Sequence, residues 1–304
     1  MINKNNIAES YYRFLNIPSG DLRISITNAC NMNCVYCHNE GQSKESLYFL
    51  SLENIKDIVE KTKRYGLTKV RLTGGDPLVH PDILSICRML KKDLKINNLG
   101  LNTNGYRACM LEEICDEQLL DQVVIGMDFF DSNVSKNSLI GPSSKEIKKE
   151  ILNLKNKGIN VQIATVFTGN INEIFLFVEW ALNNGILLKI IEVEKYDNDK
   201  FEPGKFDKLI EEVRDKFRLK IGITADLREI YLYCDQGKVL FFQYHCNRGA
   251  CHLCRNMHLR INAQGKAKPC MFRKEAYDLL NGEFDLNIRK AIANLGISPD
   301  KNIV

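Results

Sequence analysis

Residues 21–41 read Asp-Leu-Arg-Ile-Ser-Ile-Thr-Asn-Ala-Cys-Asn-Met-Asn-Cys-Val-Tyr-Cys-His-Asn-Glu-Gly. The stretch begins as a strand-like segment and continues into Cys30, Cys34 and Cys37, spaced Cys-x3-Cys-x2-Cys. Three thiolates this close, with no fourth cysteine nearby, suit a 4Fe-4S cluster that keeps one iron open. A tetrahedral zinc site would need a fourth protein ligand, and the neighbouring sequence offers neither a second Cys-x2-Cys nor a histidine pair. The stretch therefore predicts a cluster-binding loop after a strand.

The composition limits the class of protein. The chain has 304 residues, with 42 basic and 38 acidic side chains and a formal net charge of +4. An imbalance this small does not argue for nucleic acid or an anionic membrane as a partner. The sequence has no run of about 18 apolar residues and no apolar core of signal-peptide length at the N-terminus. We therefore expect a cytoplasmic protein without a membrane segment.

The chain contains eleven cysteines, which fall into three groups. In a cytosolic protein they are not a disulfide framework, because that compartment keeps thiols reduced, so cluster or metal ligation is the better expectation. The middle group, which we interpret as buried structural thiols, consists of Cys87, Cys109 and Cys115. The third group consists of Cys234, Cys246, Cys251, Cys254 and Cys270.

Strand-like runs alternate with helical ones from residue 21 to about residue 217. The expected strands are Leu22 to Thr27, Lys69 to Thr73, Leu99 to Thr103, Val123 to Met127, Ile159 to Phe167 and Leu187 to Val193. The expected helices lie near 52–65, 82–93, 109–120, 144–157, 171–184 and 205–217. Six such units with short connections predict parallel strands and right-handed crossovers. The fold class is therefore α/β, with a partial (β/α)6 TIM-type barrel at residues 1–217 and a separate C-terminal region at residues 218–304.

Polar residues alternate along several of the predicted strands, although parallel strands covered on both faces are usually apolar throughout. Arg23 lies on the polar face of the first strand, and Lys69 and Arg71 lie on that of the second. Cations on the inner face of a barrel are costly unless they meet an anion, so we interpret these three as candidate ligands for a phosphate or carboxylate. The alternative is that they pair with acids of the barrel such as Asp128 or Glu192, or lie in water at strand ends.

The second strand ends in Thr73-Gly74-Gly75-Asp76-Pro77. Paired glycines let a ligand approach the backbone closely, and the C-terminal mouth of a barrel is where active sites lie. By itself a Gly-Gly pair usually marks a turn. Asn104 follows the third strand and Asp128 the fourth, so both are expected at the same rim.

The C-terminal region carries Cys251-His-Leu-Cys254 and, after fifteen further residues, Cys270. A hairpin-like run around a glycine turn lies between them. This set could hold zinc if Cys246 or Cys234 joined it. We favour an auxiliary iron–sulfur cluster, because a protein that already carries one cluster meets no new assembly problem.

These motifs resemble the radical S-adenosylmethionine (SAM) superfamily, in which a cysteine triplet of this spacing precedes a Gly-Gly-Glu-like motif. The resemblance is most specific to the GTP 3',8-cyclases of molybdenum cofactor biosynthesis and covers nearly the whole chain. The similar runs, in order, are Asp21 to Cys37, Lys69 to Leu78, Thr103 to Tyr106, Val124 to Asp128 with Asp131, Gly185 to Glu192, and Cys251 to Phe272.

The resemblance implies two 4Fe-4S clusters, one that binds SAM and an auxiliary one that faces the substrate. An electron would cleave SAM to methionine and a 5'-deoxyadenosyl radical, which abstracts hydrogen from the substrate. A small anionic substrate and a reducing partner such as flavodoxin or ferredoxin are further implications. The implied cluster ligands are Cys30, Cys34, Cys37, Cys251, Cys254 and Cys270, with Cys246 left open as a fourth auxiliary ligand.

The resemblance also assigns binding residues. The implied SAM contacts are Tyr36, Gly74, Gly75, Asp76, Asn104 and Asp128. The implied substrate contacts are Arg23, Lys69, Arg71, Lys189, His258 and Arg260. Asp76 stands where glutamate is usual, Lys189 and His258 stand where arginine is usual, and Gly126 stands where serine is often found. Histidine in place of arginine removes a bidentate fork and leaves a group that is mostly neutral at pH 7.

Two further departures concern spacing and the chain end. The third auxiliary cysteine follows after fifteen residues instead of the family's thirteen, and the sequence ends Ser-Pro-Asp-Lys-Asn-Ile-Val304 without the cyclases' terminal Gly-Gly. We therefore expect a relative that acts on a phosphorylated nucleotide, nucleoside or sugar, with the GTP cyclase itself as the alternative. A peptide-modifying radical SAM enzyme is a third class, against which residues 1–20 look too short for peptide recognition. A non-catalytic iron–sulfur or zinc protein is a fourth, against which the Gly-Gly-Asp motif argues.

Overall fold

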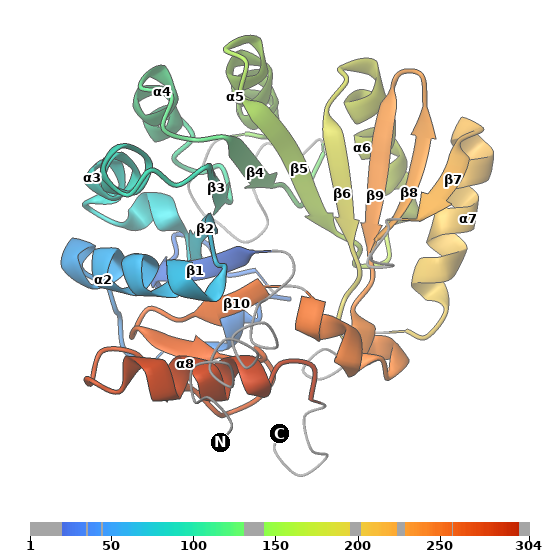
Figure 1. Ribbon diagram of the computed structural model, residues 1–304. Coiled ribbons are helices and arrows are strands. Elements are labelled where there is room, and N and C mark those ends of the chain that lie inside the picture. The colour runs from blue at the N-terminus through green and yellow to red at the C-terminus, as the bar shows by residue number, and fades with distance from the viewer. Residues whose placement is uncertain are drawn as a thin grey trace. The chain divides into compact units, whose positions relative to one another are not determined.

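The computed structural model describes residues 20–34, 36–43, 45–130, 143–194, 202–223, 229–256 and 258–297. Asp131 and the chain end after residue 297 lie outside these ranges. The chain divides into two compact units, shown together in Figure 1 and described separately below. Unit 1 comprises Met1–Cys30, His38–Leu101 and Cys251–Val304, and unit 2 comprises Asn31–Cys37 and Asn102–Ala250.

Unit 1 brings the C-terminal region beside the first strands of the chain. Its strands are β1 (Asp21–Thr27), β2 (Lys69–Gly74), β3 (Asn98–Thr103, the last two residues of which belong to unit 2), β10 (His258–Ile261), β11 (Lys266–Lys268) and β12 (Tyr277–Asp278). Their order is β12-β11-β10-β1-β2-β3. β10, β1, β2 and β3 are mutually parallel, and β10-β11-β12 are antiparallel. The predicted hairpin after the second cysteine pair is therefore confirmed as β10 and β11.

The helices of unit 1 cover the apolar faces of these strands (Figure 1). They are α2 (Leu52–Thr62), α3 (Ile83–Arg88) and α8 (Phe284–Ala293), and single turns at Lys63–Tyr65 and Met89–Asp93 continue the first two. α2 begins where the Ser51 side chain accepts a hydrogen bond from the Asn54 amide at 3.2 Å. Its buried residues Ile55, Ile58 and Val59 recur at helical spacing, so the helix presents one apolar stripe.

Unit 2 contains parallel strands that end in an antiparallel meander. Its strands are β4 (Gln122–Gly126), β5 (Asn160–Val166), β6 (Leu187–Ile191), β7 (Lys220–Ile223), β8 (Glu229–Cys234) and β9 (Gly237–Phe242). Its helices are α4 (Cys109–Asp116), α5 (Ser144–Asn156), α6 (Ile171–Asn183) and α7 (Lys205–Phe217). β4, β5, β6 and β9 are parallel neighbours, and β8 and β7 follow as antiparallel neighbours.

The predicted alternation of six strands and six helices is confirmed, as is the α/β class of a partial (β/α)6 barrel. Two features of the C-terminal third were not predicted: α8, and the parallel pairing of β9 with β6 and of β10 with β1. The domain boundary at residues 217 and 218 stays a prediction. Among the described residues, no helix has both the length and the apolar character needed to cross a bilayer.

The middle cysteines differ in burial. Cys87 and Cys115 are buried, as predicted for structural thiols. Cys109 is exposed at the start of α4, so the prediction of a buried thiol is wrong there. The first residue of an amphipathic helix can face either side, and the sequence pattern did not decide which.

Candidate active site

Three arginines form one row across three adjacent strands of unit 1. Arg23 on β1 is in register with Arg260 on β10 and with Arg71 on β2. Directly paired residues on neighbouring strands point to the same face, about 4.8 Å apart. The opposite face of β1 carries Leu22 and Ile24, which are fully buried. The row therefore lies on the polar face that the alternating sequence predicts.

The neighbouring positions complete this face. His258, Asp21 and Lys69 form the next row, two residues earlier on each strand. Gly100 on β3 is the partner of Arg71, and a Cβ there would lie 1.9 Å from the Arg71 Nη1 atom. Gly100 thus provides the space across which the Arg71 side chain lies. Five of the six predicted substrate contacts share one face of unit 1, and the sixth, Lys189, belongs to unit 2.

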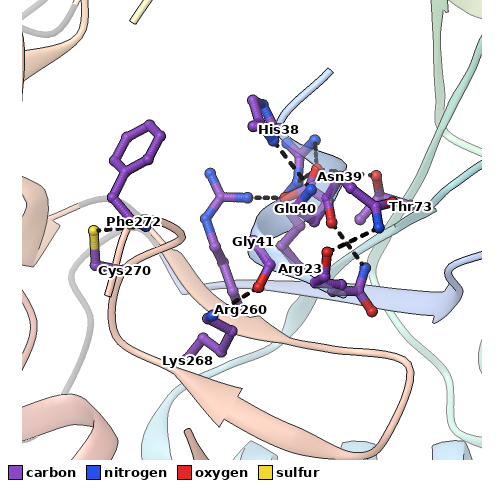
Figure 2. A network of polar contacts seen from close by, with 11 residues as sticks. Arg23, His38, Asn39, Glu40, Gly41, Thr73, Arg260, Lys268, Cys270 and Phe272 are labelled. Carbon is purple, nitrogen blue, oxygen red and sulfur yellow. Dashed lines mark hydrogen bonds and ion pairs between the residues drawn. The ribbon is translucent and has the colours of Figure 1, made fainter. Parts of the chain in front are cut away.

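A buried carboxylate, that of Glu40, contacts two arginines of this row (Figure 2). The Glu40 Oε1 atom accepts hydrogen bonds from Arg23 Nε at 2.9 Å and Nη2 at 2.6 Å, and from Thr73 Oγ1 at 3.2 Å. Glu40 Oε2 accepts a hydrogen bond from Arg260 Nη1. Asp128 and Glu192 were the acids considered as counter-ions for the strand cations, whereas Arg23 and Arg260 pair with Glu40.

Glu40 reaches this position through a left-handed turn. Asn39, Glu40 and Gly41 all have positive φ, at 44°, 52° and 70°. Non-glycine residues adopt this conformation only at a cost, which asparagine tolerates better than most. A Cβ at Gly41 would lie 2.3 Å from the Met271 carbonyl oxygen, so glycine is also required by packing.

The residues around the turn connect it to the segment that carries Cys270. Lys268 Nζ donates a hydrogen bond to the Gly41 carbonyl at 2.7 Å, and the Ala263 amide donates one to Gln42 Oε1 at 2.7 Å. Figure 2 shows Lys268 and Gly41 beside Arg260 and Cys270. The turn after Cys37 is therefore held to the C-terminal hairpin by backbone and side-chain contacts.

The charges of the row set the protonation of its neighbours. Burial alone would raise the pKa of Glu40, but the Arg23 and Arg260 guanidinium groups outweigh it and hold this pKa far below its usual range. Burial lowers the pKa of His38 to about 4; the Glu40 charge opposes this shift, and Arg260 and Arg23 add to it. Glu40 is thus an anion, and the His38 ring is neutral and accepts the Glu40 amide hydrogen at 3.0 Å.

Three C-terminal thiols lie near one end of the arginine row. Burial, together with the neighbouring Cys270 and Cys251, raises the pKa of Cys254 to about 11, although the Arg260 charge acts to lower it. Burial also raises the pKa of Cys270, which Arg260 and the Phe272 backbone amide lower. That amide donates to Cys270 Sγ at 3.4 Å. The three thiols are therefore electrostatic neighbours of one another, and Cys254 and Cys270 are also neighbours of Arg260.

The loop between Cys30 and Cys37 is held in unit 2 by two rim residues. The Tyr36 hydroxyl donates a hydrogen bond to Asp128 Oδ1, and Cys34 Sγ lies 3.7 Å from Asp128 Oδ2. Burial raises the pKa of Asp128. Asn104 Nδ2 donates to Asn31 Oδ1 at 2.8 Å. The predicted rim residues Asn104 and Asp128 therefore both contact the cysteine loop.

The Gly74-Gly75 pair has a structural role within unit 1. A Cβ at Gly74 would lie 2.1 Å from the Thr27 carbonyl oxygen, and one at Gly75 would lie 2.1 Å from that of Ala29. The pair thus lets β2 approach the backbone immediately before Cys30. Asp76 is buried, and its carboxylate accepts the Leu78 amide hydrogen at 2.9 Å. Contact of this motif with SAM remains a prediction.

The remaining basic candidate lies on β6 of unit 2. Lys189 Nζ lies 4.5 Å from the centre of the Phe242 ring, a cation–π contact. Glu192, at the end of the same strand, is 7% exposed and pairs with Arg248, which lies 2.7 Å from its Oε2 atom. This ion pair fixes the turn His245–Arg248, which contains the buried Cys246. This ion pair was not predicted from the sequence.

Both cysteine groups fit iron–sulfur clusters by their donor chemistry. Within the described residues, no three His, Cys, Asp or Glu side chains converge on a point that would hold a single metal ion. A cluster makes a different demand, because its thiolates bind different irons instead of one centre. Cys251, Cys254 and Cys270 are close enough to repel one another as thiolates, and metal binding would release their protons.

Comparison with known proteins agrees with this geometry. The model of the radical SAM superfamily matches residues 24–179. A probable GTP 3',8-cyclase of Pyrococcus horikoshii is 32% identical over 267 residues, which cover 85% of each chain. A probable GTP 3',8-cyclase of Methanococcus aeolicus is 29% identical over 282 residues, covering 88% of this chain and 91% of the relative.

Solved structures share the fold at low sequence identity. Streptococcus suis SuiB bound to its precursor peptide SuiA has a TM-score of 0.70 at 16% identity, covering 93% of this chain and 67% of that one. The enzyme anSMEcpe with bound AdoMet has a TM-score of 0.60 at 15% identity, covering 90% and 80%. At this identity the likeness shows the fold alone.

The chain belongs to the radical SAM superfamily and, at this identity and coverage, to its GTP 3',8-cyclase family. It is therefore a 4Fe-4S-dependent radical SAM enzyme of cyclase type. Its cofactors are SAM and two 4Fe-4S clusters, one that binds SAM and one auxiliary.

Proposed function

We propose that the substrate is a purine nucleoside triphosphate, with GTP as the first candidate. The observation that carries the proposal is the row of Arg260, Arg23 and Arg71 on three adjacent strands. The row places three guanidinium groups side by side on one face, and such an array suits an anion with several oxygens because each N–H···O contact is charge-assisted. Planar guanidinium groups suit phosphate oxygens geometrically. The names of the relatives support GTP, whereas His258 and Lys189 in place of arginines are reasons to test other triphosphates beside it.

We further propose that Cys30, Cys34 and Cys37 hold the cluster that binds SAM. When bound, this cluster supplies the electron that cleaves SAM to methionine and a 5'-deoxyadenosyl radical. The protein binds and orients SAM and the substrate, and it excludes water from them. Tyr36 and Asp128 support the loop from one side, and the close approach of Gly75 to the Ala29 carbonyl supports its start. The same glycine pair, Asp76 and Asn104 are the proposed contacts to SAM.

The auxiliary cluster is proposed to bind to Cys251, Cys254 and Cys270. Their mutual electrostatic effects, and the position of Cys254 and Cys270 near Arg260, support this assignment. Cys246 is buried and belongs to unit 2, and its role as a fourth ligand stays open as a prediction.

The anionic character of the substrate, the cellular location and the electron source complete the proposal. A flavodoxin or ferredoxin is the expected reductant, because the SAM-binding cluster needs an external electron for each reductive cleavage. A cytoplasmic location is expected, because the cysteines proposed as cluster ligands stay available only where thiols are kept reduced.

Binding of nucleotides to the anaerobically reconstituted enzyme tests this function. We expect saturable binding of GTP that Arg71→Gln weakens by about tenfold, because it removes charge-assisted hydrogen bonds. Arg88→Gln is the matched control, since it removes the same charge from the exposed face of α3. Protein with both clusters that binds no nucleoside triphosphate would contradict the proposal. If the two substitutions weakened GTP binding equally, the arginine row would not be the binding site.

A further inference from the structure

Glu40 connects three strands through one carboxylate. Arg23 belongs to β1, Thr73 to β2 and Arg260 to β10, and all three side chains donate to Glu40 (Figure 2). The Glu40 side chain is 7% exposed, while those of Arg23 and Arg260 are 25% and 15% exposed. A carboxylate buried among charged partners fixes their side chains, because each of its hydrogen bonds is charge-assisted.

The backbone of the turn is held in a conformation that the residues would not adopt alone. Positive φ at Asn39 and Glu40 is unfavourable for residues other than glycine and persists only where the surroundings impose it. The contacts of Gly41 with Lys268 and Met271, and of Gln42 with Ala263, are those surroundings. The structure thus maintains strain in order to place one carboxylate, which is typical of functional sites.

We propose that Glu40 is a positioning residue of the substrate site, which holds Arg23 and Arg260 in the orientation that receives the substrate phosphates. This inference rests on the proposed function of the arginine row. A guanidinium group has five N–H donors in a rigid fork, so an arginine held by a carboxylate along one edge can present another edge to phosphate. Glu40 therefore acts through the two arginines and does not itself touch the substrate.

The alternative roles of Glu40 predict different kinetics. If Glu40 only reduced the positive charge, its removal would strengthen binding of any anion, inorganic tripolyphosphate included. If it only stabilised the fold, its removal would lower the unfolding temperature without a selective change in KM. As a positioning residue, its removal raises KM for the nucleotide, because ordered guanidinium groups are lost.

The test measures steady-state kinetics with GTP for Glu40→Gln and for the double variant Arg23→Gln/Arg260→Gln. We expect Glu40→Gln to lower kcat/KM by about tenfold or more, mainly through KM, as expected for loss of a hydrogen-bonded charge. In the double-variant background, Glu40→Gln should change kcat/KM by less than about twofold, because its partners are already absent. Additive effects in the two backgrounds would overturn the inference.

Two further variants keep the test decisive. Glu275→Gln is the matched control, since Glu275 also pairs with an arginine, Arg273, at 2.5 Å but lies outside the row. If Glu40→Gln does not fold, Glu40→Asp retains the charge and shortens the side chain by one methylene. A raised KM for Glu40→Asp supports positioning, and a wild-type KM overturns it.

The result separates this inference from the proposed function. Wild-type enzyme that binds no nucleotide would refute the proposed function, and thermal unfolding would then still report whether Glu40 and Arg260 are energetically coupled. Wild-type enzyme that binds GTP with an unchanged KM in Glu40→Gln would refute the role of Glu40 alone. The EPR signal of the SAM-binding cluster, recorded for each variant, shows whether the cofactor site is intact.

Discussion

Substitution of Gly41 by alanine should destabilise the protein far more than substitution of a comparable glycine. Gly41 has φ 70°, and a Cβ there would lie 2.3 Å from the carbonyl oxygen and 2.8 Å from the Cα of Met271. Alanine in this left-handed conformation costs about 1–2 kcal/mol. A contact this short cannot be relieved by rotating a side chain, because both atoms are backbone, so displacement of a packed segment adds about 1–3 kcal/mol.

The control isolates the conformational part of this cost. Gly158 follows α5 with φ 81°, and a Cβ there would meet nothing within 4 Å. Gly158→Ala should therefore show only the conformational cost of about 1–2 kcal/mol. The difference between the two variants is the cost of moving the turn away from Met271.

Thermal and urea unfolding of the anaerobically reconstituted proteins measures this difference. For a chain of this size, a further 1–3 kcal/mol lowers the midpoint temperature by about 2–5 °C beyond that of Gly158→Ala. The displaced turn should also weaken the contact between Lys268 and the Gly41 carbonyl. Equal midpoints for Gly41→Ala and Gly158→Ala would refute the reasoning, since they would mean that the Met271 segment yields without cost.

Further predictions concern the clusters, one histidine and one ion pair. Alanine at all three cysteines of the N-terminal triplet should reduce bound iron from about eight to about four per chain, and loss of all iron would contradict a separate auxiliary cluster. Burial lowers the pKa of His80, whose Nε2 atom lies 3.1 Å from the Leu50 carbonyl. Below about pH 6.5 His80 therefore binds a proton more readily in the unfolded chain than in the folded one. The free energy of unfolding, measured with urea, should fall from pH 7 to pH 5, and it should fall less steeply in His80→Gln. In denaturant titrations, Arg248→Met should lower the free energy of unfolding by about 1–2 kcal/mol, because it leaves the buried Glu192 without this partner. Asp207 pairs with the same arginine but is exposed, so Asp207→Asn should change the free energy of unfolding by less than about 0.5 kcal/mol.

Local periodicity was sufficient to predict most of the secondary structure. The parallel strands alternate between apolar and polar faces, and each helix between them has an apolar stripe that ends near a turn residue. α8 was missed although Phe284, Ile288 and Ala291 are buried at helical spacing, because the exposed Leu286 blurs the stripe. The pairing of β10 with β1 was not predicted, because it joins segments more than 200 residues apart and no local pattern records a partner.

The residues of the candidate site were predictable where the signal is local, but their partners were not. The spacing of the cysteines and the alternation of Arg23 and Arg71 with apolar neighbours are local signals. The partner of Arg23 is not, because Glu40 reaches it through a left-handed turn and meets Arg260 220 residues further along the chain. The signal that could have drawn attention to Glu40 is the run Asn39-Glu40-Gly41, in which two residues that favour positive φ flank an acid.

The most direct test of a nucleotide substrate is whether hydrogen passes from GTP to the 5'-deoxyadenosyl group that SAM supplies. Reduced enzyme would be incubated with SAM and GTP deuterated throughout the ribose, and the 5'-deoxyadenosine formed would be analysed by mass spectrometry. We expect the 5'-deoxyadenosine to carry deuterium and to form faster with GTP than without it, and we expect Arg71→Gln to reduce both the label and the rate. Unlabelled 5'-deoxyadenosine, formed at a rate that GTP does not change, would contradict a nucleotide substrate on the arginine row.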